Sequence, residues 1–89
     1  MIQSLTKFNG IHPGAVLKRE LKKRGIKPIN LAAEVGEHKQ TISAILNERR
    51  GINANLSVKL AQFFSIDPSF YMHLQAAYEV NCILEKQRS

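Results

Sequence analysis

Apolar residues recur along the chain with the period of amphipathic α-helices, and prolines and glycines separate the repeats. Three helices are predicted over about residues 13–24, 28–35 and 38–47. Proline begins each of the first two, where its fixed φ suits a first helical turn, and Gly25 and Gly36 end them. The third helix turns apolar side chains inward and keeps polar ones outward. Its inward positions are Ile42, Ile45 and Leu46.

The second half of the chain predicts two further helices and requires no strand. After a turn over residues 48–52, Asn53 can cap the fourth helix, and Asp67 with Pro68 can cap and begin the fifth. The apolar positions at helical spacing are Leu56, Leu60, Phe63 and Phe64 in the fourth helix, and Phe70, Leu74, Ala77 and Tyr78 in the fifth. The prediction is an all-α chain with an N-terminal arm (1–10), a five-helix domain (11–80) and a helical extension or tail (81–89).

Composition limits the ways in which this chain can be stabilised. The length of 89 residues suits one domain, and 44% hydrophobic residues are enough for a packed core. Cys82 is the single cysteine, so no intramolecular disulfide can form, and no Cys/His cluster indicates a metal. No apolar run is long enough to cross a bilayer and no signal peptide is evident. We expect a cytoplasmic protein with no membrane partner.

Positive charge is concentrated in the first two thirds of the sequence. The net charge is +6, and residues 1–59 hold 11 of the 13 Lys and Arg but only 4 of the 7 Asp and Glu. Such an asymmetry favours a polyanionic partner, because basic groups that approach phosphates release condensed counterions. A solvated basic surface without a partner is the alternative.

The second and third predicted helices are separated by a very short turn, with the small residues Ala32 and Gly36 where two helices must approach closely. This spacing is typical of a helix-turn-helix, whose second helix enters the DNA major groove. Gln40 suits adenine, Lys39 suits guanine or a phosphate, and Ser43 suits either kind of base edge. The full candidate set is His38, Lys39, Gln40, Thr41, Ser43 and Asn47 for bases, and Lys27, Asn30, Arg49 and Arg50 for phosphates. An ordinary solvated helix face is the alternative.

Three stretches give the sequence a family resemblance: residues 11–14 (IHPG), 40–47 (QTIS with ILN) and 74–78 (LQAAY). Over about residues 8–80 the chain resembles the HigA-type antitoxins of type II toxin–antitoxin systems, Xre-class helix-turn-helix proteins. The resemblance implies a lambda-repressor-like fold of five helices. It also implies an antitoxin that binds and neutralises a HigB-type mRNA endonuclease toxin and, as a dimer, represses its own operon. A stand-alone Xre-class regulator, or an antitoxin that has lost strong DNA affinity, is the alternative.

The chain departs from the family pattern at several positions. Glu37 stands in the turn where an apolar residue usually packs, Ala15 where an acidic residue is common, and Tyr71 where tryptophan is frequent. Residues 27–29 (KPI) replace a Ser-Gln-Lys type start of the second helix. This last change removes a capping hydroxyl and an amide that often touches DNA.

The last predicted helix carries more apolar residues than one buried face needs, which favours a homodimer interface; full burial of this helix is the alternative. The candidates for that interface are Tyr71, Leu74, Tyr78, Cys82 and Ile83. A toxin could contact the arm (1–8), the tail, or the basic face of the first helix, formed by Lys18, Arg19, Lys22 and Lys23. Catalysis is disfavoured, because the three histidines lie on separate predicted elements and no cofactor motif is present.

Overall fold

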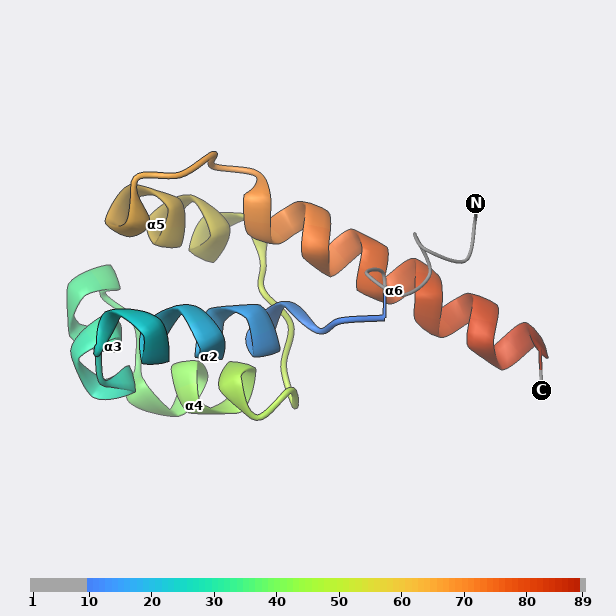
Figure 1. Cartoon of the computed structure of the whole chain (residues 1–89), viewed down its shortest axis with the longest axis horizontal. Helices are drawn as coiled ribbons and strands as arrows, with labels where there is room; N and C mark the ends of the chain where they lie inside the picture. Colours follow the sequence, from blue (N-terminus) through green and yellow to red (C-terminus); the bar gives the residue numbers. More distant parts are fainter. Residues whose placement is uncertain (1–9, 89) are drawn as a thin grey trace.

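The computed structural model describes residues 10–88, and these residues form five α-helices without a strand (Figure 1). The helices are α2 (Pro13–Arg24), α3 (Pro28–Val35), α4 (Lys39–Leu46), α5 (Ala54–Phe64) and α6 (Phe70–Arg88). The predicted all-α, five-helix fold is therefore confirmed. The predicted arm lies outside the described residues except for Gly10.

Local sequence signals set the starts and ends of the helices at or near the predicted residues. Gly25 and Gly36 adopt φ values of 68° and 69°, so each ends its helix in the left-handed conformation that glycine tolerates best. Asn53 caps α5, because its side-chain oxygen accepts a hydrogen bond of 2.8 Å from the Leu56 N–H. The predicted start of the last helix is wrong by two residues. Asp67 instead closes a turn by accepting from the Ser69 N–H and hydroxyl, and α6 begins at Phe70.

The core brings together side chains from all five helices. The largest fully buried apolar side chains are Leu17, Leu31, Ile42, Ile45, Leu60 and Tyr71. Helix α4 packs against α2 and α3, so its three predicted inward residues are all buried, as expected. Helix α6 packs on α5 and α2, and its C-terminal half extends away from the other four helices (Figure 1).

The buried face of α6 differs from the predicted one. The apolar spacing predicted a stripe that begins at Phe70, but Phe70 is 40% exposed and the two buried residues of α6 are Tyr71 and Gln75. Leu74 and Tyr78 are partly buried beside them. The buried face of α6 is centred on Tyr71 and Gln75 rather than on the predicted apolar stripe. A hydrophobic pattern leaves out the polar Gln75, which packs inward because it hydrogen bonds to Ile52 and Glu79.

Candidate nucleic-acid interface

Helix α4 presents a polar face to solvent. His38, at its N-cap, and the predicted base-contacting residues Lys39, Gln40 and Ser43 are exposed, as is Asn47 at its C-cap. Thr41 is partly buried. Because the opposite face holds three core residues, α4 cannot rotate without exposing them, and its polar face is fixed outward.

The N-termini of α3 and α4 both lack a capping side chain. Lys27 and His38 occupy the two N-cap positions, and neither side chain accepts a hydrogen bond from the helix that follows it. Pro28 has no N–H, and the N–H groups of Asn30 and Thr41 already donate to the carbonyls of Lys27 and His38. What remains for an anion such as a phosphate is the positive end of each helix dipole, with the N–H groups at the first positions that can donate: Ile29, Lys39 and Gln40. The loss of the capping hydroxyl expected from Lys27 is confirmed. Asn30, also a predicted phosphate contact, is exposed in the first turn of α3.

The turn after α4 positions two arginines. Glu48 adopts a left-handed φ of 62°, and the Arg49 N–H returns to the Ala44 carbonyl over 2.9 Å. These features form a helix-ending turn of the Schellman type, which reverses the chain directly after α4. Arg49 and Arg50 are both exposed on this turn. The turn therefore carries both arginines directly after the C-terminal end of α4.

A groove of about 480 Å³ runs between α3 and α4. Its lining residues are Pro28, Ile29, Lys39, Gln40, Ser43, Ala44 and Arg49. Four of the predicted site residues thus meet in one groove, whereas the other six do not line it. Sequence reasoning missed the three apolar members, because a helical pattern alone does not separate an apolar groove residue from a core residue.

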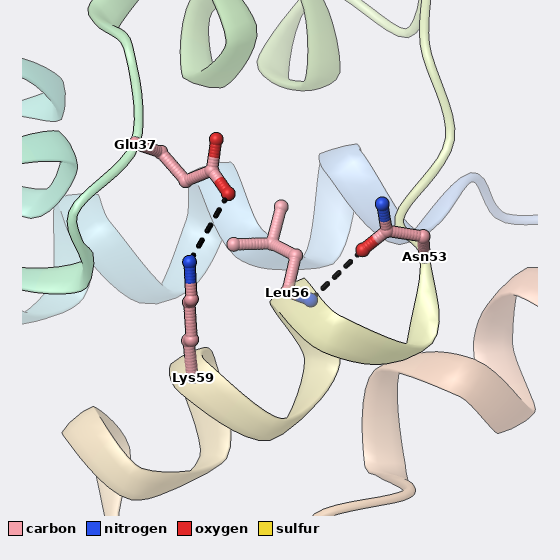
Figure 2. Close-up of polar contacts among 4 residues, drawn as sticks. All are labelled: Glu37, Asn53, Leu56 and Lys59. Atoms are coloured by element: carbon pink, nitrogen blue, oxygen red, sulfur yellow. Dashed lines mark hydrogen bonds and ion pairs between the residues drawn. The ribbon is translucent and has the colours of Figure 1, made fainter.

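An ion pair fixes the turn that precedes α4. The Glu37 carboxylate lies 3.5 Å from the Lys59 ammonium of α5, and Figure 2 shows this contact beside the Asn53 cap. Both side chains are partly exposed, so the pair contributes only modestly to stability. Glu37 therefore replaces the apolar contact usual at this position with a polar link to α5.

His12 and Gly14 fix α2 against α4 and α6. The buried His12 imidazole accepts a hydrogen bond of 2.8 Å from the Gly14 N–H through Nδ1, and its ring meets the Tyr78 ring edge-on at 4.7 Å. A Cβ on Gly14 would lie 1.8 Å from the Ile45 carbonyl oxygen, which is closer than atoms can approach. Burial lowers the pKa of His12 and the nearby Glu48 opposes this shift. The IHPG stretch therefore positions the helix that carries the candidate site.

Gln75 fixes the chain that follows the arginine turn. Its side-chain oxygen accepts a hydrogen bond of 2.8 Å from the Ile52 N–H, and its amide donates to Glu79 over 2.7 Å. A Cβ on Gly51 would lie 2.7 Å from the Gln75 amide group, so the loop packs directly on α6. The LQAAY stretch thus has a structural role.

The described part of the chain contains neither a metal-ion cluster nor a membrane-spanning helix. Residues 10–88 contain no group of three or more His, Cys, Asp or Glu side chains that could hold a metal ion. Within the same residues, no helix is sufficiently long and apolar to span a membrane.

Residues 17–71, more than half of the chain, match the helix-turn-helix family. This chain belongs to the Xre-class helix-turn-helix family. The match spans α3 and α4, so the short turn between them is the family's characteristic turn. The helix-turn-helix predicted from the Ala32 and Gly36 spacing is confirmed.

This helix-turn-helix protein is also similar to solved antitoxin structures. An addiction module antidote protein of the HigA family from Coxiella burnetii is 36% identical, with 86% of this chain and 85% of that chain covered and a TM-score of 0.82. The Pseudomonas aeruginosa antitoxin HigA, solved with the higBA promoter, is 32% identical over 86% of this chain and 85% of that one, with a TM-score of 0.83. Virulence-associated protein A' from Dichelobacter nodosus is 34% identical over 79 residues, which are 88% of this chain and 69% of that protein. The predicted HigA-type resemblance is confirmed.

The predicted dimer-interface residues of this helix-turn-helix protein do not share one exposed face. Tyr71 is 1% exposed, so its side chain belongs to the core of one copy and is not available to a second. Leu74, Tyr78 and Cys82 are partly buried, and Ile83 is 57% exposed. Val80 and Leu84, which belong to the same predicted apolar excess, are exposed on α6 at 52% and 46%.

Proposed function

We propose that this chain is a transcriptional repressor that binds operator DNA sequence-specifically by inserting α4 into the major groove. The observation that carries the proposal is the groove between α3 and α4, where basic and amide side chains from the helix-turn-helix converge. The similarity to an antitoxin solved with a promoter supports it. A protein with this function works where its DNA lies, which is the cytoplasm in bacteria such as those that hold its relatives.

The residues of the site divide into two roles by chemistry. Gln40 can form a bidentate pair with adenine, and Lys39 and Ser43 can reach neighbouring base edges in the major groove. Phosphates on either side of the groove are held by the uncapped helix N-termini and by basic or polar side chains. Those side chains are Lys27, Asn30, Arg49 and Arg50, and His38, Thr41 and Asn47 remain secondary candidates for base contacts.

The active species in this proposal is a homodimer. Two copies related by a two-fold axis would present two α4 helices to half-sites about one DNA turn apart. The exposed apolar residues near the end of α6 support pairing of copies through that helix. Leu74, Tyr78 and Cys82 recur every four residues along one side of the same helix and would border the contact.

The second part of the proposed function is the neutralisation of a toxin protein. The likeness to HigA-family antidote proteins supports a HigB-type mRNA endonuclease as the partner. In this proposal the partner binds the chain directly, and the chain represses the operon that the two genes share. The exposed basic face of α2, which includes Lys22 and Lys23, is one surface free of the DNA-facing groove.

The DNA proposal is tested with the duplex upstream of the gene and a scrambled duplex of equal composition, each at two salt concentrations. Wild-type protein should bind the upstream duplex preferentially, with an affinity that falls steeply as salt rises. Gln40→Ala should lose about 1–3 kcal/mol of that preference, whereas Gln62→Ala, an exposed glutamine on α5, should match wild type. If wild-type protein binds both duplexes equally and weakly, the proposal of a sequence-specific repressor is wrong.

The toxin proposal is tested by co-expressing the chain with the product of its adjacent gene. A complex that co-elutes in size exclusion, together with rescue of cell growth, is the expected result. Independent elution without rescue would leave a stand-alone Xre-class regulator. Gln40→Ala is the control, because α4 reads DNA in this proposal and its substitution should leave the complex intact.

A further inference from the structure

Ile29 is an exception on the DNA-facing surface, because it is a large apolar side chain among basic and amide groups. It is 55% exposed in the first turn of α3 and lines the groove next to the recognition helix. Single exposed apolar residues are ordinary on protein surfaces. Ile29 differs from those because it lies in the groove that also holds Gln40, the residue assigned to a base edge.

Three apolar residues line this groove from both of its helices. Pro28 and Ile29 come from the first turn of α3, and Ala44 comes from α4. Ala44 is one helical turn after Gln40, so the two side chains share a face of α4. A base edge read by Gln40 would therefore have apolar surface on the neighbouring side of the same groove.

The edge of one base matches this apolar surface. In the major groove, thymine is distinguished from cytosine by its C5-methyl group, which apolar side chains contact, and by its O4 acceptor. The charge of the groove favours nucleic acid over an apolar peptide or a second copy, because Lys39 and Arg49 line it and no acidic side chain does. The occupant that fits both the apolar and the charged lining is a thymine within duplex DNA.

Building on the proposed function, we propose that Pro28, Ile29 and Ala44 form a contact site for a thymine methyl group. Ile29 is then a specificity-determining residue, and it reads a base pair next to the one read by Gln40. The first turn of α3 thus reads sequence in addition to approaching phosphate. The family's usual amide at the start of this helix is replaced here by an apolar contact.

The test removes the methyl group from DNA without changing any hydrogen-bonding group. The upstream duplex is prepared with each thymine in turn replaced by deoxyuridine, and the dissociation constant of wild-type protein is measured for every substituted duplex. One position in each half-site should weaken binding roughly four-fold, the change expected when one methyl group is no longer buried. Ile29→Ala leaves only Pro28 and Ala44 in the contact, so it should discriminate between the substituted and unsubstituted duplexes clearly less than wild type at that position.

Two further variants separate a direct contact from a change in DNA shape. Ile29→Val keeps a branched apolar side chain and should retain most of the discrimination, and Val58→Ala, which alters an exposed residue on α5, should retain all of it. If Ile29→Ala discriminates as strongly as wild type, the methyl acts through DNA shape and the contact site is wrong. If wild-type protein binds the upstream duplex specifically but no deoxyuridine substitution changes its dissociation constant, the contact site is also wrong. The proposed repressor function is not affected by that result. Absence of specific wild-type binding overturns both.

Discussion

At the scale of single residues, Gly14 determines how closely α2 approaches α4. The atom that a side chain would meet is the backbone oxygen of Ile45, which cannot move aside without shifting α4. Gly14→Ala should therefore lower the free energy of unfolding by about 3 kcal/mol, measured by urea denaturation. Gly25→Ala is the comparison, because a Cβ added at residue 25 would have no neighbour within 4 Å. The substitution introduces only backbone strain at a φ of 68°, which should lower the free energy of unfolding by about 1 kcal/mol. Equal losses for the two variants would contradict this view of Gly14.

His12 makes the stability of the fold depend on pH. The Gly14 N–H bond needs an unprotonated Nδ1, and burial lowers the pKa of His12 below its ordinary value of 6.5. The unfolded chain therefore binds a proton at this residue more readily than the folded chain. The contribution of His12 to the free energy of unfolding should be fully present above pH 6.5. It should be lost as the pH drops from that value toward the pKa of the folded state.

Thermal unfolding at pH 7.5 and pH 5.5 measures this dependence. His12→Asn is the matched control, since asparagine can accept the same N-cap hydrogen bond and does not titrate. The melting temperature of wild type should drop more between the two pH values than that of His12→Asn. Parallel drops in both proteins would assign the pH dependence to other groups.

At the scale of helices, the predicted boundaries of α2 and α3 agree with the structure because their signals are local. Pro13, Pro28, Gly25 and Gly36 act through their own backbone, so their effect is readable from neighbouring residues alone. The buried face of α6 was not readable in this way. Gln75 is buried because its side chain bonds to the Ile52 N–H. That partner lies 23 residues away in the sequence, so the apolar pattern of α6 contains no sign of the bond.

The same distinction applies to the candidate site. The outward face of α4 was predicted because its three core residues fix the rotation of the helix. The groove was not predicted, because it forms only where α3 packs against α4. An apolar residue such as Ile29 fits a helical pattern equally well whether it lines a groove or belongs to a core. The role of Glu37 also depended on a distant partner, Lys59 of α5.

The uncapped start of α3 indicates a trade between stability and DNA affinity. Lys27→Ser should supply the missing hydroxyl cap and raise the free energy of unfolding by about 1 kcal/mol. The same substitution removes a positive charge beside the groove, so the slope of log affinity against log salt should decrease by about one. Lys27→Gln is the control, because it removes the charge without adding a good cap. Urea denaturation and salt titration of DNA binding measure the two effects, and equal stability of the two variants would contradict the capping argument.

At the scale of the whole molecule, α6 gives the chain its elongated shape. The described residues measure 40 × 24 × 23 Å, and the last turns of α6 extend beyond the bundle (Figure 1). Val80, Ile83 and Leu84 are exposed there at 46–57%. A short helical end is marginal in water on its own, and burial of its apolar side chains against a second copy would stabilise it.

The double variant Ile83→Glu, Leu84→Glu tests whether this end of α6 joins two copies. Carboxylates in an apolar contact repel each other and lose hydration, so the molar mass from light scattering should fall from that of a dimer to that of a monomer. A monomer engages one half-site at a time, and its affinity for the upstream duplex should be lower by roughly a hundred-fold. Val58→Glu adds charge at a residue of α5 that is 41% exposed and should leave the dimer intact. A dimeric double variant with unchanged helix content would move the interface away from residues 83 and 84, and the partly buried Leu74, Tyr78 and Cys82 would then be tested in the same way.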